Sequence, residues 1–172
     1  EARDNYRNTP LIHAARRNTN PEVLSVLIKA GAELGARDEN GFTPLILAAR
    51  SNTPEVVSVL IKAGAKLDER ADNGLTPLMV AAMDNASPEV VAVLIKAGAE
   101  LEVRDHDGFT PLMAAAGFNT SAEALSVLIK AGAELEARND DGMTPLLYAA
   151  HYNSNPEVVS VLIKAGAELE AR

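Results

Sequence analysis

The 172-residue sequence contains no cysteine, which excludes a disulfide framework, thiolate catalysis and cysteine-based zinc sites. It has no apolar run close to the ~20 residues that a membrane-spanning helix needs. Basic residues are outnumbered, with 16 Lys and Arg against 24 Asp and Glu and a formal charge of −8. This balance argues against a nucleic-acid or membrane partner, because nucleic acids and anionic membranes both need a basic patch.

Aromatic residues are also scarce, with three Tyr, three Phe and no Trp making up 3% of the chain. The core must therefore be built from Ala, Val, Leu and Ile, which favours small helices in close contact. The hydrophobic fraction of 47% is nevertheless that of an ordinary globular chain, and the length permits a single domain.

What the sequence does contain is a repeat. The tripeptide Thr-Pro-Leu and the pentapeptide IKAGA each occur five times, always in the same order and at a nearly constant interval. The tripeptides begin at Thr9, Thr43, Thr76, Thr110 and Thr144, and the pentapeptides at Ile28, Ile61, Ile95, Ile129 and Ile163. In both series a single step is shorter than the others, by one position. Such regularity predicts a repeat architecture.

Each copy predicts two short helices. In the last copy Thr144 is a suitable N-cap with Pro145 in the first turn, and Asn153 is a plausible end for this first helix. A second start follows at Asn155-Pro156, with equivalents at Asn20, Thr53, Ser87 and Ser121. The second helix is apolar on most sides, so only stacking against neighbouring copies can bury it. We therefore predict an all-α repeat solenoid.

Glycines mark the ends of these elements. The second helix of each copy ends at Gly31, Gly64, Gly98, Gly132 or Gly166, residues suited to the left-handed position after a helix. The connector that follows carries Asn-Gly or Asp-Gly at 40–41, 73–74, 107–108 and 141–142, which predicts tight turns.

The shared pattern DGxTPLxxAA…PEVVxVLIKAGAELEA resembles the ankyrin repeat over essentially the whole chain. The resemblance implies one domain over 1–172, with approximate repeats 4–37, 38–70, 71–104, 105–138 and 139–172. It further implies a curved stack with projecting turns, a concave groove lined by the first helices, and non-enzymatic binding of a protein partner. The family's His after TPL is replaced here by Ile12, Ile46, Met79, Met113 and Leu147, so we expect apolar packing in its place.

Positions that vary between copies are the candidates for function, because the scaffold is repeated. Every Tyr, Phe and His falls at such a position, at a turn tip, before Thr-Pro or on the outer face of the first helix. By resemblance, these positions line the partner-binding groove, and Tyr and Arg are enriched at binding hot spots. The candidate site residues are Tyr6, His13, Arg16, Arg17, Phe42, Leu47, Arg50, Met83, Asp84, His106, Phe109, Phe118, Tyr148, His151 and Tyr152.

A structural interpretation competes with this one. Phe42 and Phe109 precede Thr-Pro, where an apolar residue would brace the neighbouring turn. Tyr148 and Tyr152 would pack between repeats with their hydroxyl groups in water. The sequence leaves both interpretations open.

Charge differs along the expected groove. Arg16, Arg17 and Arg50 lie near its start, and Asp84, Asp140 and Asp141 lie further along. This order predicts a ligand with an acidic end and a basic or aromatic end.

No motif indicates catalysis. The sequence contains no GxGxxG, P-loop or HExxH pattern, and His13, His106 and His151 belong to different copies. We therefore expect no enzyme activity, no cofactor and no metal site. The compartment is not indicated, and the cytoplasm is the default expectation.

The terminal copies are as apolar as the internal ones and lack the polar caps that solenoids usually have. Two interpretations fit: a segment of a longer array, or head-to-tail association with other copies of the chain. The alternatives to partner binding are an engineered or structural array without a natural ligand, and an accessory segment of a larger enzyme or effector.

Overall fold

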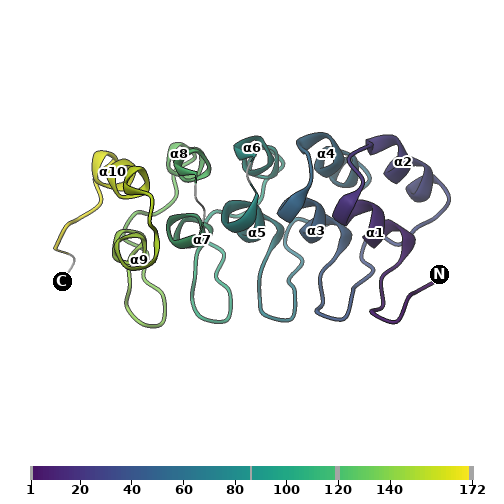
Figure 1. The fold of residues 1–172 in the computed structure, drawn as a ribbon, viewed down its shortest axis with the longest axis horizontal. Helices are drawn as coiled ribbons and strands as arrows, with labels where there is room; N and C mark the ends of the chain where they lie inside the picture. Colours follow the sequence, from purple (N-terminus) through teal and green to yellow (C-terminus); the bar gives the residue numbers. More distant parts are fainter. Residues whose placement is uncertain (1, 86, 119–120, 171–172) are drawn as a thin grey trace.

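A computed structural model describes residues 2–85, 87–118 and 121–170. Residues 1, 171 and 172, which belong to the domain expected over 1–172, lie outside the described part, as do residues 86, 119 and 120. The described residues form ten helices and no strand. Figure 1 shows two parallel rows of helices, with the two ends of the chain at opposite ends of the stack. The predicted helical solenoid is confirmed.

The rows alternate along the chain. The first row contains α1 (Pro10–Arg17), α3 (Pro44–Ser51), α5 (Pro77–Asp84), α7 (Pro111–Phe118) and α9 (Pro145–Tyr152). The second row contains α2 (Pro21–Lys29), α4 (Pro54–Lys62), α6 (Pro88–Lys96), α8 (Ala122–Lys130) and α10 (Pro156–Ala165). Five loops project beyond the first row (Figure 1), and we call them fingers one to five: residues 3–9, 37–43, 70–76, 104–110 and 138–144.

The predicted helix starts are largely confirmed. Each Thr before a first-row helix accepts a hydrogen bond from the backbone N–H three residues later, at 3.2–3.4 Å. Asn20, Ser121 and Asn155 cap second-row helices by accepting a hydrogen bond from the backbone N–H two residues later. Thr53 and Ser87 make no side-chain cap bond, so the expectation is wrong there. A cap of this type contributes about 1 kcal/mol to helix stability.

The core lies between the rows and between successive helix pairs. Alanines such as Ala48, Ala49 and Ala81 are fully buried and allow the first-row helices to approach closely. The residues that replace the family's His pack into this core as expected at Ile12, Ile46, Met79 and Met113, each at most 1% exposed. Their equivalent Leu147 is 44% exposed, because the part of the chain that the structure describes has no further helix pair beyond α9 and α10.

The fingers are tight turns that also bond to one another. The glycines at 41, 74, 108 and 142 have positive φ, as predicted from the Asn-Gly and Asp-Gly pairs. In finger two the backbone N–H of Asp38 donates to the carbonyl oxygen of Phe42 at 3.1 Å, which closes the turn. The N–H of Glu39 then donates to the carbonyl of Tyr6 in finger one, also at 3.1 Å. Finger two is thus stabilised by a hydrogen bond within the turn and by a second one to finger one.

An arginine ladder runs along the bases of the fingers. Arg3 donates from Nη1 to the backbone carbonyl of Arg37 at 3.1 Å, and Arg37 donates to that of Arg70 at 2.6 Å. In the same way, the side chain of Arg70 donates to the backbone carbonyl of Arg104, and the side chain of Arg104 donates to that of Arg138. The ladder therefore links consecutive fingers through side chain to backbone hydrogen bonds.

An asparagine ladder holds the helix ends together. The buried Asn85 donates from Nδ2 to the carbonyl oxygens of Ala49 at 2.8 Å and of Asn52 at 3.1 Å, both in the preceding copy. Asn52 and Asn153 make the equivalent bond to a first-row carbonyl of the copy before theirs. Sequence reasoning identified Asn153 only as a helix end, and this role was missed.

Candidate functional site

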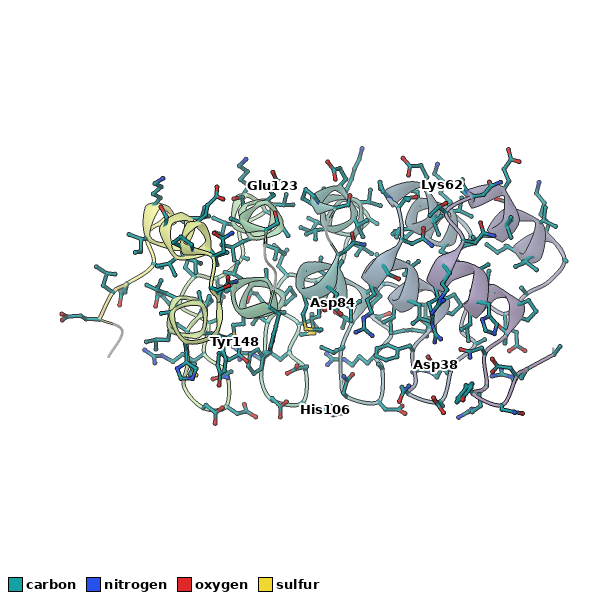
Figure 2. All side chains as sticks on the ribbon, viewed as in Figure 1. Asp38, Lys62, Asp84, His106, Glu123 and Tyr148 are labelled. Atoms are coloured by element: carbon teal, nitrogen blue, oxygen red, sulfur yellow. The ribbon has the colours of Figure 1, made fainter. Side chains whose placement is uncertain are left out.

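The surface between the fingers and the first-row helices is hollowed, and we call it the finger groove. Its first cavity, of about 540 Å³, is lined from finger two and α1 and α3, and its second, of about 310 Å³, from fingers three and four and α5, α7 and α9. Figure 2 shows Asp84 and Tyr148 on this side of the molecule, whereas Lys62 and Glu123 lie on the second row. The candidate residues Arg16, Arg17, Phe42, Leu47 and Arg50 line the first cavity.

The second cavity collects a further group of candidates. Met83, Phe109, Phe118 and Tyr148 line it together. These candidates come from α5, finger four, α7 and α9 and are thus brought to one place. Tyr6 lies by a smaller cavity between fingers one and two, and it is exposed.

Exposure separates the candidates into three groups. Tyr6, His13, Arg17, Arg50, Asp84, His106, Phe118, His151 and Tyr152 are exposed; Arg16, Phe42, Met83 and Phe109 are partly buried; Leu47 and Tyr148 are buried. Most of the candidate residues are therefore accessible to a partner. The binding role of each stays a prediction.

Leu47 and Tyr148 are not on the outer face of their helices, which corrects the sequence expectation. Leu47 is only 4% exposed and Tyr148 only 8%, and the equivalent Val80 and Ala114 are buried as well. This helix position packs against the preceding copy. The equivalent His13 is exposed, since the described residues include no copy on that side of α1.

Tyr148 is the centre of an aromatic cluster. Its ring lies 4.7 Å from that of Phe109 and 5.6 Å from that of Phe118, both edge-to-face, and 4.4 Å from that of Tyr152. Burial raises the pKa of the Tyr148 hydroxyl, with smaller contributions from Tyr152 and from nearby aspartates. The packing interpretation of Tyr148 is thus confirmed, and Phe109 contacts it from finger four.

Gly117 makes this cluster sterically feasible. A Cβ atom at Gly117 would lie 2.2 Å from Cε1 and 2.3 Å from Cδ1 of Tyr148. The glycine of one copy therefore accommodates the tyrosine of the next, a complementarity that sequence reasoning did not detect.

The arginines of the groove are largely paired within the protein. Arg16 contacts the buried carboxylate of Asp38 at 2.8 Å, and Arg50 contacts Asp84 at 2.7 Å. Both arginines are therefore neutralised by carboxylates of the chain itself. The prediction of a ligand with an acidic end, which relied on these charges, loses most of its support. Arg17 is exposed and forms no ion pair within the described part of the chain.

Sequence reasoning also missed the aspartates that build the fingers. Oδ1 of Asp38 accepts hydrogen bonds from the N–H groups of Asn40 and Phe42, and Oδ1 of Asp105 accepts the equivalent pair. In finger one, hydrogen bonds lower the pKa of Asp4 to about 2, first that of the Asn8 side chain and then those of the Asn8 backbone, the Tyr6 backbone and His13, against an opposing effect of burial. An acidic residue or Asn three positions before the turn Gly was the available signal.

The histidines do not form a site. His13 contacts Asp4 at 3.0 Å, His151 meets the Tyr152 ring edge-to-face with ring centroids 4.3 Å apart, and His106 lies at the tip of finger four (Figure 2). Among residues 2–85, 87–118 and 121–170, no three His, Cys, Asp or Glu side chains are grouped so that they could hold a metal ion.

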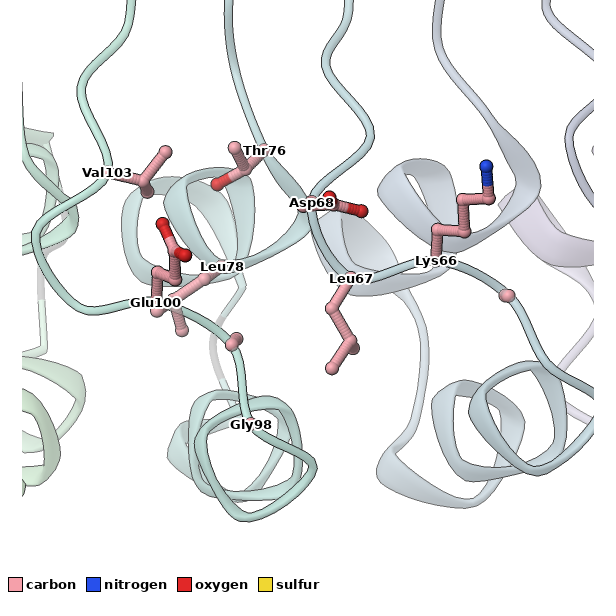
Figure 3. A pocket seen from close by; sticks show the side chains of 10 residues that line it. Lys66, Leu67, Asp68, Thr76, Leu78, Gly98, Glu100 and Val103 are labelled. Carbon is pink, nitrogen blue, oxygen red and sulfur yellow. The ribbon is translucent and has the colours of Figure 1, made fainter.

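A separate cavity of about 390 Å³ lies between the connectors after α4 and α6 (Figure 3). Lys66, Asp68 and Glu100 border it, and Figure 3 shows their charged ends well apart. This cavity therefore offers no converging chemistry, and the finger groove remains the candidate site.

Comparison with known families agrees with this architecture. The family description ankyrin repeats (3 copies) matches residues 11–105 and 78–172. The chain belongs to the ankyrin-repeat family, whose members are typically non-enzymatic modules that bind other proteins. A comparison with curated proteins found no match. Within the described residues, no helix has the length and apolar character needed to cross a membrane.

Proposed function

We propose that this chain is a non-enzymatic module that binds a protein partner through the finger groove. The observation that carries the proposal is the exposure of large aromatic side chains beside the second cavity. Phe118 is 50% exposed and Tyr152 is 55% exposed, although both contact the Tyr148 ring. Clustered exposed aromatics are unfavourable in water and are typical of binding surfaces.

The test is a comparison of partners captured by three forms of the chain. Phe118→Ala/Tyr152→Ala truncates the exposed rings and leaves the buried Tyr148 in place. Glu55→Gln/Glu123→Gln is the matched control, because both carboxylates are exposed on second-row helices away from the groove. We expect the control to retain the partners of the unmodified chain and the groove variant to lose them. Identical partner sets for all three forms would overturn the proposal.

We further propose that the chain associates head to tail, because its two end faces are the halves of its own internal interface. At one end Val26 is 65% exposed and Leu27 is partly buried. Leu60, which corresponds to Leu27 in the second copy, is fully buried. At the other end Leu147, Ile163 and Leu169 are exposed. Placing one end on the other would repeat a contact that the chain already makes inside.

A further inference from the structure

The second cavity of the finger groove combines two kinds of lining. Phe109, Phe118 and Tyr148 supply three aromatic rings, and Leu75 and Met83 add apolar surface. Two acidic residues, Asp105 and Asp107, border the same cavity from finger four. Its volume lies at the small end of the range of about 300–1,000 Å³ seen for ligand pockets, which suits a single long side chain.

The two carboxylates carry charge that the protein does not neutralise. Asp38 and Asp84 are paired with arginines in the N-terminal half of the groove. Neither Asp105 nor Asp107 forms an ion pair in the part of the chain that the structure describes. Oδ1 of Asp105 accepts hydrogen bonds from the backbone N–H groups of Asp107 at 3.0 Å and of Phe109 at 2.9 Å, and these bonds hold the carboxylate in place. The negative charge is thus fixed at the cavity and available to a ligand.

The field of these groups extends to the aromatic cluster. After burial and Tyr152, the negative charges of Asp105, Asp107 and Asp141 each contribute to the raised pKa of Tyr148. All three aspartates therefore disfavour a further negative charge at the ring and favour a positive one. A cation close to an aromatic ring gains a second attraction from the ring's quadrupole.

We propose that this cavity binds an arginine side chain of the partner. Arginine fits both parts of the lining, because its planar guanidinium stacks on aromatic rings and bonds carboxylates with a fork of N–H donors. Its aliphatic stem is suited to the surface of Met83 and Leu75. The inference rests on the proposed binding role of the finger groove and specifies the residue type that anchors the partner there.

The direct test uses two peptides that differ in one charge. Acetyl-Gly-Gly-Arg-Gly-Gly-amide is titrated into the chain, and the peptide with citrulline in place of Arg is the neutral control. Methionine methyl groups labelled with ¹³C report the site, because Met83 lines the cavity while Met79 and Met113 are buried in the core. We expect a saturable shift of the Met83 methyl resonance with the arginine peptide, and at least tenfold weaker binding of the citrulline peptide.

Variants then test the carboxylates. Asp105→Asn/Asp107→Asn removes both charges but keeps the turns, since Asn139 accepts the equivalent bond in finger five and Asn40 precedes the turn Gly of finger two. This variant is expected to bind both peptides equally weakly, with unchanged Met79 and Met113 resonances as evidence of folding. Glu55→Gln/Glu123→Gln makes the same change in net charge on the second row and is expected to retain the preference. A lysine peptide that binds as well as the arginine peptide would establish a general cation site and overturn the choice of arginine.

Equal affinity for arginine and citrulline, or no saturable shift at Met83, would overturn the inference. Its failure can be separated from that of the proposed function. If captured partners depend on Phe118 and Tyr152 but bind Asp105→Asn/Asp107→Asn normally, the groove function stands and the arginine site is wrong. If the arginine peptide binds but no partner depends on the groove, the cation site stands and the proposed function is wrong.

Discussion

The environment of Tyr148 shows how a residue can be variable in the repeat and still structural. Its ring fills the space that Gly117 leaves in the preceding copy and is almost fully buried. The sequence marked Tyr148 correctly as unusual. It could not indicate the reason, because the matching glycine belongs to another copy and lies in a different helix, α7.

Gly117→Ala is therefore expected to destabilise the protein, by about 1–2 kcal/mol. The added methyl group would overlap the Tyr148 ring, and overpacking of this kind outweighs the gain of roughly 1 kcal/mol from replacing a helical Gly. The measurement is the free energy of unfolding in urea.

The control for this prediction is the same change beside a smaller neighbour. In a Tyr148→Leu background, which copies the residue at Leu47, Gly117→Ala is expected to become stabilising because the overlap is gone. A destabilisation of equal size in both backgrounds would show that Tyr148 is not the cause.

Finger three lacks the acceptor that the other fingers share. Ala71 occupies the place of Asp38 and Asp105, and Arg50, equivalent to Arg16, pairs with Asp84 instead. Ala71→Asp is expected to add about 0.5–1.5 kcal/mol by accepting backbone N–H groups, as measured by thermal or denaturant unfolding. Ala71→Asn supplies the acceptor without the charge, so the difference between the two variants isolates any contribution from Arg50. A loss of stability in both variants would contradict this account.

At the scale of elements, the sequence predicted the helices well and their connections less well. Thr caps, Pro in the first turn and terminal Gly act locally, so five first-row starts could be located from a few residues each. The ladders could not be found that way. Their partners are backbone carbonyls in a neighbouring copy. Every residue has such a carbonyl, so the sequence does not indicate which ones accept a bond.

The asparagine ladder leads to a prediction about the helix ends. Asn85→Ala is expected to cost on the order of 2–4 kcal/mol, because the carbonyls of Ala49 and Asn52 and the N–H of Ser87 would lose a buried partner. Asn18→Ala is the matched control. Asn18 accepts a bond from the N–H of Asn20, and the described residues include no earlier copy for it to bond, so in this chain its loss is expected to cost about 1 kcal/mol or less. Equal costs at both positions, measured by urea unfolding, would exclude a special role for the ladder.

The candidate site was only partly predictable, for a related reason. Variation between copies located the groove and most of its exposed residues. It could not distinguish Leu47 and Tyr148, which face the preceding copy, from Tyr152, which faces water. Nor could it show that Arg16 and Arg50 are paired within the chain, because their partners lie in the next finger and the next helix pair.

At the scale of the whole molecule, the end faces predict an association that two variants can dissect. Val26→Lys blocks one face and Ile163→Lys blocks the other, since both side chains are exposed. In sedimentation velocity we expect the sedimentation coefficient of the unmodified chain to rise with its concentration, and each variant to sediment as a monomer. A mixture of the two variants is expected to stop at a dimer, because each retains one intact face. A strictly monomeric chain at high concentration would contradict the proposal.

The ladders also determine how the molecule would respond to force. Their hydrogen bonds span 33 to 37 residues and join only adjacent copies. Pulling on the two ends of the chain therefore loads each junction in series, and the outermost copy, held on one side only, gives way first. Every such event releases one repeat length, roughly 110–120 Å of extended chain. Under load the stack is therefore expected to lengthen in equal steps, one repeat at a time.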